Sequence, residues 1–225
     1  MKSEQLILAL DVPTAQEALS WIERLGPRIG YYKVGLQLFS TGGPELVRNL
    51  RSHGVNIFLD LKLHDIPNTV AKAVDAILDL DVQLLTIHAS GGQAMCKAAV
   101  HAAQGSDLKL LGVTVLTSLD EIDVAEIGFK ETPPKLVPRL AQLATKVGVH
   151  GIVCSAIEVA HLKQQVPEGT LLVTPGIRPV DSETGDQSRI ATPESALASG
   201  STHLVIGRPI LQAENPEAVL DTLLT

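Results

Sequence analysis

The sequence predicts a single-domain (β/α)8 barrel, an α/β fold in which eight parallel strands alternate with helices over residues 1–225. Eight short apolar segments recur along the chain, and most are continuous rather than alternating, as in parallel strands covered on both faces. Helical patterns separate these segments, and a length of 225 residues suits one barrel. The expected strands are Gln5–Leu10, Tyr31–Val34, Ile57–Leu61, Gln83–Ile87, Leu110–Leu116, Gly151–Cys154, Leu171–Thr174 and His203–Ile206.

Helix start signals lie between the expected strands. Thr14 and Glu17 have capping-box spacing, and an apolar stripe follows them. Four prolines stand where a first helical residue is expected, namely Pro44, Pro67, Pro193 and Pro216. A doubly wound open sheet is the alternative fold, but it usually has fewer strands, and no G-x-G-x-x-G follows the first strand here.

One connection is longer and more polar than the others. Residues Arg178–Ile190 read RPVDSETGDQSRI and follow the seventh expected strand. Long loops in compact domains are often functional. We therefore expect an active-site lid at about 178–190.

Composition excludes several classes of protein. The net charge is −7 and there is no run of Lys or Arg, which argues against nucleic acid or an anionic membrane as a partner. No apolar run approaches the ~20 residues of a membrane span. We expect no signal peptide, because the N-terminal apolar run is short for a signal-peptide core and no cleavage-type segment follows it. Cys96 and Cys154 are too few for a disulfide scaffold. We expect a cytoplasmic protein.

The segment Asp60–Thr69, with the sequence DLKLHDIPNT, is the most informative in the chain. It continues an apolar strand into charged residues. Alternate side chains of a strand share a face, so Asp60 and Lys62 are expected to project together. Because buried charges are costly unless paired, this arrangement favours catalysis over a purely structural ion pair.

Other strand ends also carry chemistry, and strand C-termini hold the active site of a barrel. Asp11 and Lys33, each taken alone, are as well explained by solvated charges as by a functional role. For His88, a packed histidine is at least as good an explanation as a catalytic one. Near the seventh and eighth strands, glycines with Arg208 predict a phosphate site, because glycine permits close approach and arginine supplies a bidentate charge. The glycines are Gly176 and Gly207. The seven histidines show no metal-ligand spacing, so no metal site is expected.

Asp60–Thr69 closely resembles the signature of the orotidine 5′-phosphate decarboxylases, and the resemblance extends over the whole chain. Further matching segments are LALD, YYKVG, TVLTS, TPGIRP, DQSRIATP and VIGRPI, in chain order. The chain is similar to the compact, monofunctional bacterial form. The resemblance implies conversion of orotidine 5′-monophosphate to uridine 5′-monophosphate and CO2, the last step of pyrimidine (UMP) synthesis, without a cofactor.

The resemblance also implies a role for each matching residue. Lys62 is the expected proton donor, and Asp60, Asp65 and Lys33 complete the catalytic set. A homodimer is implied, in which Asp65 and Thr69 reach the neighbouring active site. The implied substrate contacts are Asp11 and Lys33 at the ribose, Asp60 and Thr69, Thr117 and Ser118 near the pyrimidine, and Arg178, Gln187, Gly207 and Arg208 at the phosphate or lid.

Two other functions remain as alternatives. Sugar-phosphate decarboxylases of the same superfamily share the barrel and the D-x-K-x-x-D core, but they differ after the lysine and use Mg²⁺. A non-catalytic nucleotide-binding barrel has no need for Lys62 between two acids.

Overall fold

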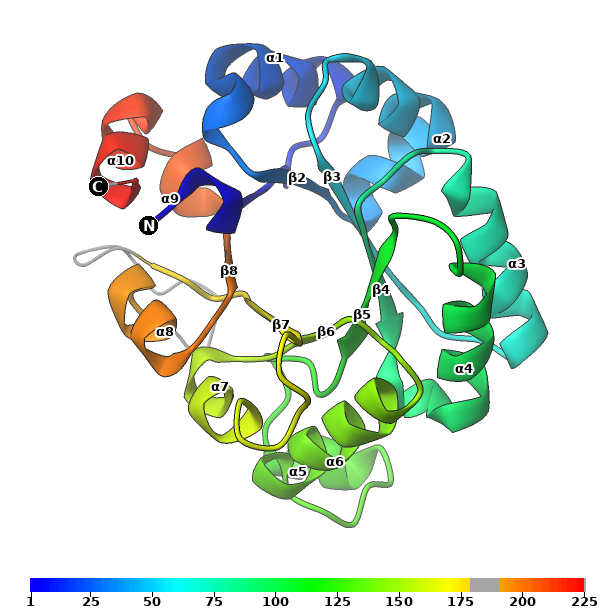
Figure 1. Cartoon of the computed structure of the whole chain (residues 1–225). Helices are drawn as coiled ribbons and strands as arrows, with labels where there is room; N and C mark the ends of the chain where they lie inside the picture. Colours follow the sequence, from blue (N-terminus) through cyan, green and yellow to red (C-terminus); the bar gives the residue numbers. More distant parts are fainter. Residues whose placement is uncertain (179–190, 225) are drawn as a thin grey trace.

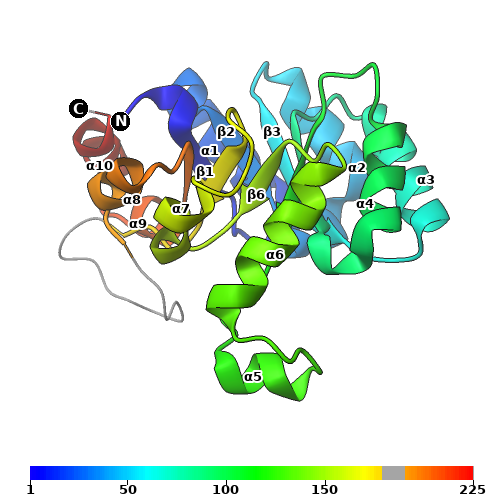
Figure 2. The ribbon, with the colours of Figure 1, turned by 60° about the horizontal axis from the view of Figure 1, so that its bottom comes forward.

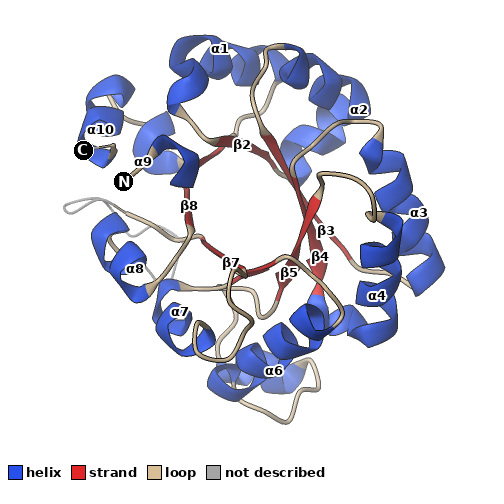
Figure 3. Ribbon diagram, in the orientation of Figure 1, coloured by secondary structure: helices blue, strands red, loops and turns tan. Residues whose placement is uncertain are grey.

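The computed structural model describes residues 1–178 and 191–224. Within these ranges, eight parallel strands pair in chain order, and β8 pairs with β1 to close the barrel. Helices surround the ring of strands (Figure 1, Figure 3). The predicted (β/α)8 barrel is confirmed. The strands are β1 (Leu6–Ala9), β2 (Tyr31–Val34), β3 (Ile57–Leu63), β4 (Leu84–His88), β5 (Lys109–Val113), β6 (Gly151–Val153), β7 (Leu171–Thr174) and β8 (His203–Ile206).

The helices begin largely where the sequence signals predict. Thr14 accepts a hydrogen bond from the backbone N–H of Glu17 and so caps the first helix. Pro44 likewise begins a helical segment, because α2 is interrupted by a kink at Gly43, where φ is +58°, and Pro44 is the first residue after it. The helices are α1 (Ala15–Leu25), α2 (Leu36–Ser52), α3 (Pro67–Leu78), α4 (Gly92–Ala102), α5 (Glu121–Glu126), α6 (Pro133–Lys146), α7 (Ala156–Leu162), α8 (Pro193–Ser199), α9 (Arg208–Leu211) and α10 (Pro216–Leu223).

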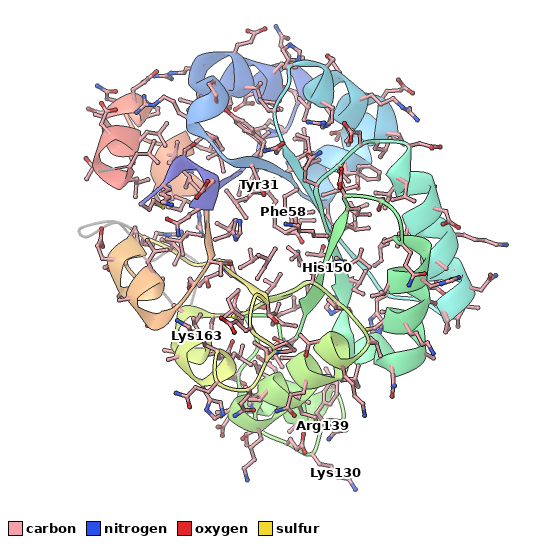
Figure 4. The ribbon with its side chains drawn as sticks, in the orientation of Figure 1. Tyr31, Phe58, Lys130, Arg139, His150 and Lys163 are labelled. Carbon is pink, nitrogen blue, oxygen red and sulfur yellow. The ribbon has the colours of Figure 1, made fainter. Side chains whose placement is uncertain are left out.

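The apolar core has two layers, which explains why the strands are apolar on both faces. Inside the ring, Phe58 packs with residues of five other strands (Figure 4). Its neighbour Leu59 points outwards and packs in the larger layer between the barrel and the helices. Burying one such side chain contributes about 1.5–3 kcal/mol. The inner layer comprises Ile7, Ala9, Phe58, Leu84, Leu111, Val173 and Val205.

The fifth strand is shorter at its C-terminal end than predicted. β5 ends at Val113, which pairs with the last residue of β6, Val153. Without a neighbouring strand to pair with, the backbone leaves the sheet. Leu116 and Thr117 consequently lie in the connection to α5, which stands away from the barrel at the end of α6 (Figure 2).

The two ends of the chain lie side by side on the outside of the barrel (Figure 1). The N-terminal ammonium of Met1 donates to the carbonyl oxygen of Leu223 at 2.9 Å. Arg24 of α1 forms an ion pair with Glu217 of α10. None of the helices in the described ranges has the length and apolar character needed to cross a bilayer. Residues 179–190, most of the predicted lid, lie outside the described residues.

Candidate active site

A cavity of about 240 Å³ opens at the C-terminal ends of the strands, where the sequence placed the site. Seven of the eight strands or the connections that follow them contribute to its walls. Four cationic and two anionic side chains line it, although the chain as a whole carries a net charge of −7. The lining residues are Ala9, Asp11, Lys33, Phe58, Asp60, Lys62, Val113, Val115, Leu116, Thr117, Val153, Val173, Pro175, Gly176, Arg178, Val205, Gly207 and Arg208.

Asp60 and Lys62 meet in this cavity, but simple strand alternation is not the reason. The pairing of β3 with β4 shifts between Leu59, which faces Leu85, and Leu63, which faces Ile87. The extra residues on β3 form a bulge, in which Lys62 adopts φ of +51°. This left-handed conformation is costly for a residue other than glycine, and such strain often accompanies functional sites.

The bulge places the Lys62 ammonium against both oxygens of Asp60, with Nζ 2.8 Å from each. Lys33 approaches the same carboxylate from β2, with its Nζ 3.6 Å from Oδ2 of Asp60. Asp11 then continues the series, because its Oδ1 lies 3.3 Å from Lys33 Nζ. Acidic and basic side chains therefore alternate across the C-terminal ends of β1, β2 and β3.

The inner members of this array are the most buried. The side chains of Lys33 and Asp60 are 11% and 13% exposed, whereas that of Asp11 is 60% exposed. Burial acts to raise the pKa of Asp60, but Lys33 and Lys62 and the hydrogen bonds to the carboxylate outweigh it and keep the pKa lowered. Asp60 is thus an anion held in place by two cations.

Thr86 of β4 joins the array, and the sequence analysis did not identify it. It is fully buried, and its Oγ1 lies 2.9 Å from Oδ1 of Asp60. Thr86 Oγ1 also accepts a hydrogen bond from the backbone N–H of Lys62 at 2.8 Å. The signal in the sequence was a hydroxyl residue between the apolar residues Leu85 and Ile87.

His88 packs beside this array, outside the cavity lining. Its ring lies 5.1 Å from that of His64, centroid to centroid. Burial lowers the pKa of His88, and His64 and Lys62 lower it further. The interpretation of His88 as a packed histidine fits this environment.

The opposite wall of the cavity comes from β7 and β8. Arg178 is 7% exposed and donates through Nη1 to its neighbouring carbonyl at Ile177. Gly207 precedes α9, and a Cβ at this position would lie 3.3 Å from the Cβ of Ala9. Arg208, the first residue of α9, completes this wall. The predicted combination of glycine and arginine is therefore present at one place.

Several predicted site residues lie away from the cavity lining. Asp65 and Thr69 are exposed at the start of α3, and Asp65 Oδ1 accepts the backbone N–H of Ile66 at 2.6 Å. Ser118 is exposed, whereas its neighbour Thr117 lines the cavity. Gln187 lies outside the described residues.

The apolar part of the lining was not predicted from the sequence. Val113, Val153, Val173 and Val205 come from β5 to β8 and project into the ring. In the sequence these valines are indistinguishable from other core residues. Among residues 1–178 and 191–224, no group of three or more His, Cys, Asp or Glu side chains is placed to hold a metal ion.

Comparison with known proteins identifies the family. The model of the orotidine 5′-phosphate decarboxylase / HUMPS family matches residues 4–223. The chain belongs to this family. An orotidine 5′-phosphate decarboxylase of Aliivibrio salmonicida is 47% identical over 99% of this chain and 97% of the relative. One of Pseudoalteromonas translucida is 49% identical over 97% of this chain and 95% of the relative.

One solved structure carries the family's name, and a second shares the fold. The crystal structure of orotidine 5′-phosphate decarboxylase from Lactobacillus acidophilus has a TM-score of 0.86 and 36% identity, covering 97% of this chain and 96% of that one. An uncharacterised conserved protein from Geobacillus kaustophilus has a TM-score of 0.83 and 33% identity, covering 98% of this chain and all of that one. The resemblance inferred from Asp60–Thr69 is confirmed.

Proposed function

We propose that the chain is a carboxy-lyase that converts orotidine 5′-monophosphate to uridine 5′-monophosphate and CO2, the last step of UMP synthesis. The observation that carries this proposal is the Lys33–Asp60–Lys62 array in the wall of the cavity. Two cations hold one buried carboxylate there, so the Lys62 ammonium is fixed before substrate arrives. The curated relatives named above carry the corresponding enzyme name.

The reaction needs electrostatic stabilisation more than any other assistance. The bond between C6 and the carboxylate breaks, CO2 leaves, and the electron pair remains at C6 in the plane of the ring. Because the ring's π system cannot delocalise that pair, a preorganised cation must stabilise it. Lys62 supplies this charge and then transfers a proton from Nζ to C6, after which solvent reprotonates the amine.

The charge of the cavity fits the charge of this substrate. Its four cations and two anions leave a surplus of positive charge, whereas orotidine 5′-monophosphate carries a phosphate and a carboxylate. In this proposal Arg178, Gly207 and Arg208 hold the phosphate, and Gln187 joins them from the lid at 178–190. Phosphate sites after strands 7 and 8 recur in this fold.

The opposite side of the substrate lies along β1, β2 and β5. Asp11 and Lys33 bind the ribose hydroxyls, and Thr117 and Ser118 lie near the pyrimidine. Binding energy from the remote phosphate and ribose can then drive organisation of the charged site around C6. The chemistry assigned to these residues requires no cofactor.

We also propose that the protein is cytoplasmic and that two copies of the chain form a homodimer across the open rim of the barrel. Asp65 and Thr69 of one copy then complete the partner's site, where the carboxylate of Asp65 is a second neighbour for Lys62. Three large apolar side chains on this rim are exposed, Leu36, Ile66 and Leu116, and Ile66 is 67% exposed. A second copy seated there would cover apolar surface that water otherwise contacts.

A subunit-mixing experiment tests the dimer and the role of Asp65 together. Lys62→Ala and Asp65→Ala subunits, each inactive alone, are unfolded, mixed in equal amounts and refolded. Half of the refolded dimers then contain one subunit of each kind, and each of these has one intact site out of two. About a quarter of all sites are therefore intact, so about a quarter of wild-type activity should return. No recovery, with dimers present by sedimentation, would refute a site shared between subunits.

The reaction itself is tested by the loss of ultraviolet absorbance of orotidine 5′-monophosphate in EDTA. We expect rapid conversion by the wild type, with CO2 and uridine 5′-monophosphate as products. Conversion of sugar phosphates that depends on added Mg²⁺, without turnover of the nucleotide, would instead support the related sugar-phosphate decarboxylase. Tight binding of uridine 5′-monophosphate without turnover would support a binding protein.

A further inference from the structure

We propose that Thr86 is a positioning residue, whose hydroxyl sets the geometry of Asp60 and Lys62 without touching the substrate. The inference rests on the proposed decarboxylation for its kinetic consequences, and it extends the site beyond the charged residues of the sequence signature. Thr86 lies outside the cavity lining, behind the two side chains that it positions.

The hydroxyl of Thr86 bridges two parts of the site. Its hydrogen is donated to Oδ1 of Asp60 at 2.9 Å, and its oxygen accepts the backbone N–H of Lys62 at 2.8 Å. One buried group therefore fixes the orientation of the carboxylate and the backbone from which the ammonium extends. Because Asp60 Oδ1 also accepts from Lys62 Nζ at 2.8 Å, the three groups form a closed set of hydrogen bonds.

The bulge in β3 explains why this position requires a hydroxyl. Regular pairing with β4 is lost between Leu59 and Leu63, so the N–H of Lys62 has no ladder partner there. A buried N–H without an acceptor is costly, and Thr86 Oγ1 supplies the acceptor. The same contact holds Lys62 at φ of +51°, a conformation that lysine on its own disfavours.

Valine and serine variants separate the hydroxyl from the shape of the side chain. Thr86→Val keeps the volume and removes both hydrogen bonds, whereas Thr86→Ser keeps the hydroxyl and removes a methyl group. We expect Thr86→Val to lower kcat by about 10- to 100-fold, the factor associated with a hydrogen bond to a charged group. KM should change much less, and Thr86→Ser should retain most of the activity.

Thr174 provides a matched control for the loss of a buried hydroxyl. It is also fully buried, at the end of β7, and its Oγ1 lies 2.7 Å from the hydroxyl oxygen of Ser201. It does not line the cavity. Thr174→Val should lower the melting temperature. It should leave kcat within about twofold of wild type and the position of the pH profile unchanged.

The pH profile gives a readout that general destabilisation would not move. Loss of the Thr86 donor removes a hydrogen bond to the charged form of Asp60, so its pKa should rise. The acidic limb of kcat/KM should shift upwards by roughly one pH unit in Thr86→Val and stay in place in Thr86→Ser. The titratable groups that act on Asp60, namely Lys33, Lys62 and His88, are unchanged in both variants.

Carboxyl NMR titration of Asp60 tests the same inference without substrate. An upward shift of its pKa in Thr86→Val, absent from Thr86→Ser and Thr174→Val, would support the positioning role even if another reaction were catalysed. Failure of the wild type to convert the nucleotide would refute the proposed function alone. Unchanged kcat and an unchanged Asp60 pKa in folded Thr86→Val would overturn the proposal. If valine prevents folding, Thr86→Cys, which retains only a weak donor, carries the same comparison.

Discussion

Replacing Lys62 by alanine tests the centre of the proposed mechanism. The change removes an ammonium whose Nζ lies 2.8 Å from both oxygens of Asp60. The nearest remaining cation on that carboxylate is Lys33, at 3.6 Å from Oδ2. Lys33 is also engaged by Asp11 at 3.3 Å, so it does not replace the lost proton donor.

The expected loss follows from the two tasks assigned to Lys62. A general acid contributes about 10²- to 10⁴-fold to rate, and a preorganised electrostatic group about 10²- to 10³-fold. Since one ammonium performs both tasks, Lys62→Ala should lower kcat by about 10⁴-fold or more. Lys62→Arg should also be nearly inactive, because a guanidinium keeps the charge but rarely releases a proton.

The assay is the ultraviolet loss of orotidine 5′-monophosphate at saturating substrate, with melting temperature and circular dichroism as checks on folding. Lys72→Ala is the matched control, since Lys72 is an exposed lysine on α3, away from the cavity. It should behave as wild type. Turnover by folded Lys62→Ala within tenfold of wild type would refute the assignment of Lys62 as proton donor and electrostatic catalyst.

Three further predictions concern the same cavity. Lys62→Gly should be more stable than Lys62→Ala by roughly 0.5–1 kcal/mol, because glycine tolerates φ of +51°; at Lys72, in a regular helix, denaturant titration should give the opposite order. Arg208→Ala should weaken binding of uridine 5′-monophosphate by about 10- to 100-fold and leave uridine nearly unchanged; equal losses by calorimetry would remove Arg208 from the phosphate site. Burial alone would raise the pKa of Asp60, but the two lysines lower it by more, so the pKa in the folded protein lies below that in the unfolded chain. Asp60 therefore contributes stability above pH of about 4 that fades as the pH falls; Asp60→Asn should lose less stability on acidification than wild type, and identical slopes would contradict this.

The sequence predicted the barrel because its strands are apolar on both faces and recur with helices between them. Leu59 and Phe58 show why the pattern is readable, since one packs outwards and the other inwards. The predicted positions of the strand ends were less accurate. Leu116 was placed in a strand although β5 stops at Val113, because the end of a strand depends on its neighbour, and β6 is only three residues long.

The charged residues of the candidate site were predicted from the sequence, but their geometry was not. Asp60 and Lys62 were expected together from the alternation of a regular strand, and they meet instead through a bulge in which Lys62 takes a left-handed conformation. A bulge depends on the register of two strands, which no single segment encodes. Thr86 was missed for the same reason, because its hydroxyl gains meaning only from the atoms of β3 beside it.

The sequence by itself thus determined the fold class, the family and the residue types that carry charge at the ends of the strands. These follow from local periodicity and from a specific run of residues, Asp60–Thr69. Only the tertiary structure decided which charges touch, how deeply they are buried and which neutral residues hold them. Such contacts join residues far apart in the chain, and their energies depend on distances and burial that arise only when the barrel closes.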